Sequence, residues 1–342
     1  MRILANTNYD FIRWRWHALA LSALILLTGV GLMVKQGGPA LGIDFSGGTS
    51  IVLKFDQATP EETVRRALES ISGDKIVQQY GQPGDNEIMV RLPVMEGTEQ
   101  GTSLDQSSKQ VVQTLQEAKI GTFEVAGSEL VGPIIGRDLQ RRGIWAVVLS
   151  ILGIGVYIAL RFRPSFAVGA MVATVHDILV VLAFLTFVQQ FRIGYELSLN
   201  VVAAILTIAG YSVNDTIVIF DRVRENLRVL RRESLTTIVN RSVNQTLSRT
   251  VITTGTTLLA MMALFLFGGE VLKGFAYSML VGIIVGTYST VFIASSIAIV
   301  VSKRGREARA GATAPPAATA TAAAPAAPSV SARPKVRRRR RG

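Results

Sequence analysis

The sequence contains no cysteine among its 342 residues, and histidine appears only twice, as His17 and His176. The absence of cysteine excludes a disulfide framework, a thiol nucleophile and a thiolate metal site. No HExxH, P-loop or GxSxG motif is present either. We therefore expect a protein that is not an enzyme and that holds no metal or cofactor.

Charged residues are also scarce, at 18% of the chain against 49% hydrophobic residues. This composition is too apolar for an ordinary soluble domain and indicates a membrane protein. Six segments are long and apolar enough to cross about 30 Å of hydrocarbon. They are residues 18–34, 143–160, 166–188, 197–220, 250–267 and 272–301.

The first segment is short and follows basic residues, as a secretory signal peptide does. No convincing small-residue cleavage site follows it, and five further spans favour a retained helix. We therefore expect a polytopic α-helical membrane protein with six transmembrane helices.

Basic residues mark one side of the predicted membrane region. Arg161 and Arg163 separate the second and third spans, and the connection 221–249 contains a series of arginines. The positive-inside rule then places 1–17, 221–249 and 302–342 in the cytoplasm and 35–142 outside. Because the net charge of +12 sits largely in these loops and the last residues, it indicates topology rather than nucleic-acid binding.

The long outer segment, residues 35–142, predicts a small α+β domain. The expected order is a strand near 51–55, a helix from Thr59 as N-cap, strands at 75–80 and 88–92, a helix at 104–119 and a strand at 122–131. This β-α-β-β-α-β order is the ferredoxin-like pattern.

The end of the chain has a different composition. Residues 308–334 are mainly Ala, Pro, Thr and Ser with almost no large apolar side chain, and five arginines follow at 337–341. Such a segment cannot bury enough apolar surface to fold, so we expect disorder. The basic cluster is either a solvated tail or a contact for anionic lipid or ribosomal RNA phosphate.

Two acidic residues lie well inside predicted spans, where a charge costs about 2.5–3.5 kcal/mol on insertion scales. Asp177, preceded by His176, is near the middle of the third span, and Asp215 lies in the fourth. Arg249 stands at the start of the fifth span. A buried carboxylate whose proton affinity depends on a nearby guanidinium can carry protons, although a structural buried ion pair is the alternative.

Further polar and small residues accompany these positions. Asp221, predicted at the membrane edge, points about 120° away from Asp215 and pairs naturally with Arg222. Asn214 and Thr253 are secondary polar candidates, the latter on a polar stripe of the fifth span. The sixth span carries small residues every fourth position, which allow close helix packing: Gly274, Ser278, Gly282, Gly286 and Thr290.

Several long motifs resemble those of the SecD/SecF family of the RND superfamily, and those of SecF more than SecD. They are Gly42-Ile43-Asp44-Phe45-Ser46-Gly47-Gly48, Val131-Gly132-Pro133, Gly210 to Arg222, Asn244 to Thr250, and Gly268-Gly269 with Gly286 to Ser289. The resemblance covers about residues 5–302 and implies an RND-type half with a ferredoxin-like periplasmic domain between its first two helices.

The resemblance also implies a function. Such a subunit joins SecD in the bacterial inner membrane and works with the SecYEG channel, YidC and the SecA-driven pathway. It uses the proton-motive force to assist translocating preproteins. The family's relay aspartate falls on Asp215, its arginine on Arg249 and its His-Asp pair on His176-Asp177. The glycine-rich turn with Gly42, Asp44, Gly47 and Gly48 is where motion would reach the outer domain.

Two other functions stay open at this point. An RND-type exporter of lipids or small molecules would act as a homodimer and needs a larger outer domain than the 108 residues of 35–142. A non-transporting scaffold of the translocon would leave Asp215 and Arg249 without a task. No specific nucleic-acid partner is expected, and membrane lipid is the general surrounding.

Overall fold

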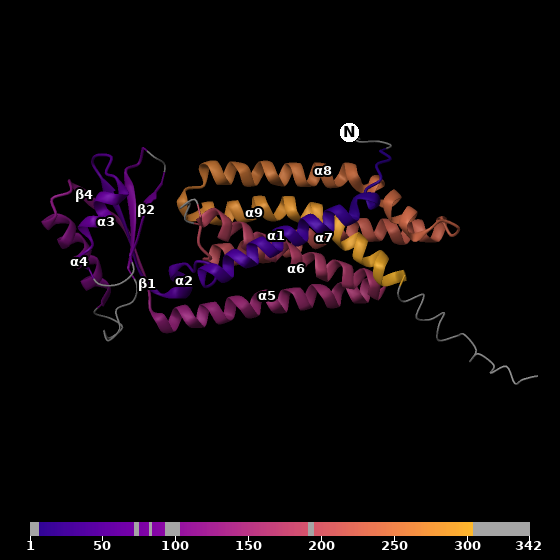
Figure 1. Cartoon of the computed structure of the whole chain (residues 1–342), viewed down its shortest axis with the longest axis horizontal. Helices are drawn as coiled ribbons and strands as arrows, with labels where there is room; N and C mark the ends of the chain where they lie inside the picture. Colours follow the sequence, from indigo (N-terminus) through magenta and orange to yellow (C-terminus); the bar gives the residue numbers. More distant parts are fainter. Residues whose placement is uncertain (1–6, 72–74, 82–83, 93–102, 191–194, 304–342) are drawn as a thin grey trace, which may run out of the picture. The chain divides into compact units, whose positions relative to one another are not determined.

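The structure, a computed structural model, describes residues 7–71, 75–81, 84–92, 103–190 and 195–303. Six long helices run side by side in it (Figure 1), which confirms the predicted six-helix membrane fold. Their bounds are Arg15–Gln36 (α1), Pro133–Arg161 (α5), Pro164–Gln189 (α6), Leu199–Val229 (α7), Leu235–Phe267 (α8) and Glu270–Ser289 (α9). The predicted disordered tail lies, from residue 304 onward, outside the described residues.

The helices continue beyond the apolar segments. A short 3₁₀ helix, Ile12–Trp14 (η1), precedes α1, and a π-helical turn, Thr290–Ala294 (η2), continues α9. The expected connection 221–249 is largely helical, because α7 ends only at Val229 and Ser234 caps α8 by accepting a hydrogen bond from the Thr237 amide.

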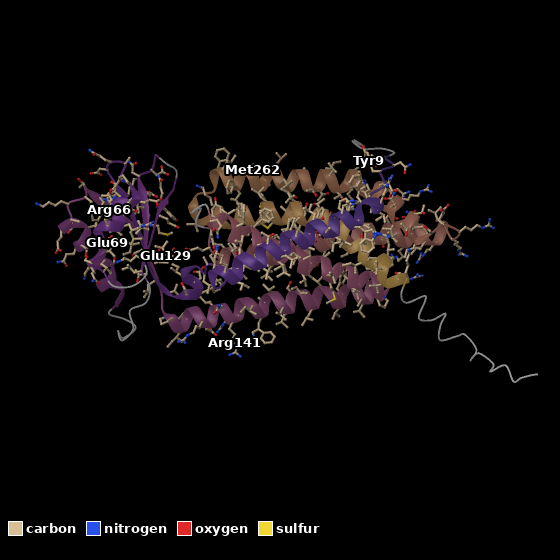
Figure 2. The ribbon with its side chains drawn as sticks, viewed as in Figure 1. Tyr9, Arg66, Glu69, Glu129, Arg141 and Met262 are labelled. Atoms are coloured by element: carbon tan, nitrogen blue, oxygen red, sulfur yellow. The ribbon has the colours of Figure 1, made fainter. Side chains whose placement is uncertain are left out.

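Three helices form the interior of the bundle and three surround it. In the apolar windows of α6, α7 and α9, 50–61% of residues are buried, against 11–17% in α1, α5 and α8. Figure 2 shows Arg141 on α5 and Met262 on α8 pointing away from the bundle. The buried carboxylates of the third and fourth spans therefore belong to the central helices, whereas α8 is a peripheral helix.

The segment between α1 and α5 contains a four-stranded antiparallel sheet in the order β2-β3-β1-β4. The strands are Gly48–Phe55 (β1), Ile76–Tyr80 (β2), Glu87–Leu92 (β3) and Phe123–Val131 (β4), with the helices Glu61–Ala67 (α3) and Ser103–Glu117 (α4). A four-residue helix, Ile43–Ser46 (α2), precedes β1. This is the predicted ferredoxin-like order.

The core of this domain follows the predicted periodicity. Alternate residues of β1 pack with the apolar faces of α3 and α4, and Leu53, Val64 and Leu115 are fully buried. The predicted N-cap of α3 was wrong by one residue. Pro60 occupies that position with an extended ψ of 138°, and the Thr59 hydroxyl donates to the Gln57 carbonyl instead of capping the helix.

The glycines of α9 that face α7 differ in how much space a side chain would find there. A Cβ added at Gly282 would lie 2.3 Å from Ile208 Cδ1, one at Gly286 would lie 3.1 Å from Ser212 Cβ, and one at Gly274 would lie 3.5 Å from Val201 Cγ2. Only the last is an ordinary van der Waals contact. Close approach of α9 to α7 thus depends on Gly282 and Gly286, but not on Gly274.

This grading predicts the stability of three alanine variants. Gly282→Ala should lower the free energy of unfolding by about 1–3 kcal/mol, because Ile208 must move. Gly286→Ala should cost less, and Gly274→Ala should be neutral or stabilising, because alanine favours helix by about 1 kcal/mol over glycine. Thermal unfolding of the three variants in detergent measures the order. An equal effect of Gly274→Ala and Gly282→Ala would contradict it.

Candidate functional site

The carboxylate of Asp177 on α6 is fully buried and is held by neighbouring helices. Its Oδ2 accepts a hydrogen bond from Ser212 Oγ of α7 at 2.6 Å and another from Ser289 Oγ at the end of α9 at 2.8 Å. Its Oδ1 lies 3.0 Å from Nδ1 of His176. Asp177 therefore joins the three central helices through its Oδ2, while its Oδ1 contacts a residue of its own helix.

His176 is the second member of this cluster and is also buried. Its Nε2 has no hydrogen-bond partner among the described residues. The ring lies 6.5 Å, centroid to centroid, from Tyr288, whose hydroxyl donates to the Ala18 carbonyl of α1 at 2.6 Å. His176 and Asp177 are thus in direct contact. The histidine ring also lies near Tyr288 of α9, which in turn bonds to α1.

The π-helical turn η2 lies directly beside Asp177. The hydroxyl of Thr290, the first residue of this turn, lies 3.0 Å from the hydroxyl of Thr216 on α7. Ser295 Oγ donates a hydrogen bond to the Thr290 carbonyl. A π turn widens the helix and shifts the side chains after it, and such turns are frequent at functional sites. Here it lies between Ser289, which binds Asp177, and the remainder of the sixth span.

Asp215, on α7, differs from Asp177 in its partners. Its side chain is 4% exposed, and its Oδ2 is buried without a hydrogen-bond partner among the described residues. The charge of Arg249 on α8 acts on it, yet no ion pair within 4.0 Å joins the two in the part of the chain that the structure describes. A buried carboxylate oxygen without a donor is costly, so this site suits a group that gains and loses a proton.

The start of α8 is tied to the N-terminal segment of the chain. The side-chain amide of Asn244 accepts a hydrogen bond from the Tyr9 amide and donates one to the Tyr9 carbonyl, both at 2.8 Å. Asn240 Nδ2 donates to the same carbonyl at 3.0 Å. Figure 2 shows Tyr9 beside this end of α8. Because Asn244 precedes Arg249 by little more than one helical turn, this contact helps fix the position of the arginine.

The predicted partner of Asp221 was wrong. Its Oδ1 lies 2.7 Å from Arg224 Nη2 and 3.6 Å from Arg161 Nη2, whereas Arg222 pairs with Glu225 at 2.6 Å. On a helix, residues three apart share a face and adjacent residues do not, which explains the difference.

Neither of the two secondary polar candidates bonds to a buried carboxylate in the part of the chain that the structure describes. Asn214 is exposed on α7. The Thr253 hydroxyl donates to the carbonyl of Arg249 within α8 at 2.9 Å.

The glycine-rich turn before β1 contacts the start of α7 directly. Asp44 Oδ2 accepts a hydrogen bond from the Leu199 amide, the first residue of α7, at 2.8 Å, and the Gly42 amide donates to the Leu197 carbonyl. Gly47 and Gly48 have φ of +71° and +129°, which glycine adopts without strain. The helix that carries Asp215 is thus bonded to the segment that leads into the sheet.

A second contact joins the sheet to the segment that immediately precedes α7. Arg91 of β3 forms an ion pair with Glu196, and the two side chains are only 12% and 11% exposed. Burial raises the pKa of the Glu196 carboxyl, and the guanidinium of Arg91 opposes that rise.

Comparison with known proteins agrees with this arrangement. Residues 110–304 match the family model described as "Protein export membrane protein SecD/SecF, C-terminal", and residues 37–59 match the SecD/SecF GG motif. A protein translocase subunit SecF of Rhodothermus marinus is 39% identical over 92% of this chain and 100% of its own length. The chain belongs to the SecF family. The SecF of Escherichia coli O157:H7 is 38% identical over 85% of this chain and 87% of its own.

The fold also matches solved structures of SecDF. The crystal structure of SecDF, described as a translocon-associated membrane protein, from Thermus thermophilus superposes with a TM-score of 0.76 at 35% identity over 90% of this chain. A structure of SecDF in the super-membrane-facing form gives 0.65 at 34% identity over 91%. This SecF-family chain covers only 40% and 41% of those two chains.

Several polar residues around the site were not predicted from the sequence. Ser289 stands only within a family motif, and Thr254, whose hydroxyl lies 3.0 Å from that of Thr287, is not among the predicted site residues. The pairing of Asn240 and Asn244 with Tyr9 joins residues more than 230 positions apart. A pattern read along one helix does not contain such contacts.

The Arg91–Glu196 ion pair predicts a pH-dependent docking of the sheet. Arg91→Met leaves a buried carboxylate without its counter-ion, which costs about 3–5 kcal/mol. We call the form in which β3 lies against Glu196 the docked form. In this variant the pKa of the Glu196 carboxyl rises further in the docked form, so docking takes up a proton. Docking should therefore be weak at neutral pH, recover as the pH falls and be lost again as the pH rises through that pKa.

Spin labels on the exposed Glu69→Cys and Met262→Cys positions, both labelled in Figure 2, report this docking through the width of their distance distribution. Arg91→Met should broaden the distribution at neutral pH and narrow it on acidification. The matched Arg91→Met, Glu196→Gln pair should stay narrow at every pH. A distribution unchanged by Arg91→Met would show that the ion pair does not hold the sheet.

Proposed function

We propose that the chain pairs with SecD and that the pair uses the proton-motive force to assist Sec-dependent export of proteins across the bacterial inner membrane. Asp215 is the proton-carrying carboxylate, and Arg249 sets its charge state. His176 and Asp177 form the second polar site of the relay. The observation that carries the proposal is the buried Oδ2 of Asp215, which has no hydrogen-bond partner in the described part of the chain, on a central helix of a SecF-family protein.

The energy available to such a site is sufficient for a conformational change. One elementary charge that crosses 100 mV releases about 2.3 kcal/mol. This free energy shifts a two-state equilibrium by roughly fiftyfold. Because Arg249 stays charged at all physiological pH values, a change in its distance from Asp215 changes the proton affinity of the carboxylate.

The route from the proton site to the outer domain runs along α7. Asp215 lies 16 residues after Leu199, so about 24 Å of helix connects the two. The Leu199 amide bonds to Asp44, beside the turn that enters β1. A shift of α7 would therefore act on the sheet through Asp44 and through the Arg91–Glu196 ion pair, which is the coupling that a proton-driven export subunit requires.

The exposed helices support a heteromeric assembly. Six helices with one outer domain make half of a pseudosymmetric twelve-helix unit, and SecD supplies the other half. Arg249 is exposed on α8 in the isolated chain, and a partner would enclose it. We propose both termini in the cytoplasm and the sheet outside. SecYEG, YidC, the SecA-driven pathway and translocating preproteins are the further partners, and no cofactor is required.

The other two functions have less support. A homodimeric exporter of lipids or small molecules is disfavoured by the match to protein translocase subunits along nearly the whole chain. A non-transporting scaffold does not require an unpaired buried carboxylate on α7. The following experiment separates the scaffold from the proton-driven subunit.

Asp215→Asn keeps the shape of the side chain and removes its titration. It should preserve assembly with SecD and the ATP-driven part of export, and it should abolish the part that responds to a proton gradient. Arg249→Ala should do the same. Preprotein export into inverted inner-membrane vesicles, measured with and without a gradient, tests both.

Asp221→Asn is the matched control, because this carboxylate is half exposed at the end of the apolar part of α7. It should retain most of the gradient response. An undiminished response in Asp215→Asn vesicles would show that Asp215 is structural and would favour the scaffold.

A further inference from the structure

The turn between α5 and α6 and the adjoining face of α7 enclose a cavity of about 370 Å³. Four arginines line it: Arg161, Arg163, Arg224 and Arg228. The only carboxylate paired with any of them in the described part of the chain is Asp221, which contacts Arg161 and Arg224. The group therefore has a net charge of three positive units, four guanidiniums against one carboxylate.

The two pairs of arginines play different parts. The guanidiniums of Arg161 and Arg224 lie over the ring of Phe162, at 5.6 and 5.7 Å from its centroid, and both contact Asp221. They are thus fixed in orientation. Arg163 and Arg228 are exposed and have no ion pair within 4.0 Å among the described residues. Two arginines are thus held by Asp221, and the other two leave their positive charge facing the cavity.

The cavity also has an apolar wall. Phe162, Phe166 and Phe220 line it, and the ring of Phe166 lies 4.9 Å from that of Phe220 in an edge-to-face contact. The site stands where two membrane helices end, because Arg161 is the last residue of α5 and Pro164 the first of α6. Guanidinium groups above phenylalanine rings at this depth match a phosphate that is attached to hydrocarbon chains.

We propose that this cavity binds the headgroup phosphate of an anionic phospholipid of the adjacent leaflet. The four arginines contact the phosphate, and the partly exposed ring of Phe162, backed by the buried Phe166 and Phe220, contacts the start of the acyl chains. A soluble phosphate would use the arginines alone and gain nothing from the aromatic wall. The lipid would occupy the turn between α5 and α6 together with α7, and so would brace the end of the helix that carries Asp215.

The test compares two double variants with the same change in charge. Arg163→Gln, Arg228→Gln removes the unpaired arginines of the cavity. Arg231→Gln, Arg232→Gln removes two exposed arginines just after α7 that do not line it. The full-length chain is purified in mild detergent, and the retention of phosphatidylglycerol and of phosphatidylcholine is measured by native mass spectrometry.

The wild type should retain phosphatidylglycerol in preference to phosphatidylcholine. The cavity variant should bind phosphatidylglycerol roughly thirtyfold more weakly, at about one kcal/mol for each arginine, and the control should be nearly unchanged. Arg163→Lys, Arg228→Lys should keep the preference, which covers the case in which the glutamine variant does not fold. Equal losses in the two glutamine variants, or no preference for the anionic lipid, would overturn the proposal, as would displacement of the lipid by inorganic phosphate at similar concentration.

Discussion

Asp177 is a carboxylate that solvent does not reach, and the rest of the bundle is arranged around its hydrogen-bond donors. An unpaired charge at this depth would be prohibitive, so Ser212 and Ser289 must both lie within hydrogen-bond distance of one oxygen. That requirement fixes α7 and α9 against α6. It also explains the close approach at Gly286, where an added Cβ would lie 3.1 Å from Ser212 Cβ. The π-helical turn after Ser289 shifts the side chains of the remainder of the sixth span relative to Ser289.

The two buried carboxylates of the bundle then serve different purposes. Asp177 has partners for both oxygens, and its hydrogen bonds hold α6 against α7 and α9. Asp215 lies on the same helix as Ser212 but has a buried oxygen to which no described residue donates. Its counter-charge, Arg249, is on the peripheral helix α8, whose position depends on the N-terminal segment at Tyr9. Because Asp177 holds the three central helices together while the counter-charge of Asp215 lies on a peripheral helix, α8 can move while the core stays intact.

The sequence was sufficient for the six helices and for the order of the sheet, because hydropathy and strand alternation are local patterns. It also pointed to Asp177 and Asp215, since charged residues in apolar runs are conspicuous. It could not supply their partners. Ser212 and Ser289 meet Asp177 only after three helices have packed, and the asparagines of α8 meet Tyr9 from the other end of the chain. The pairing of Asp221 with Arg224 and Arg161 shows the same limit, because the sequence offered Arg222 as the adjacent cation.

The central claim is that Asp215 is the carboxyl group that exchanges a proton with the surroundings. Infrared difference spectra of the membrane-reconstituted protein across a pH step detect the carbonyl stretch of a protonated carboxyl group directly. The account predicts a carboxyl band that responds to pH, disappears in Asp215→Asn and persists in Asp177→Asn. Loss of the band in Asp177→Asn, with its retention in Asp215→Asn, would contradict the assignment.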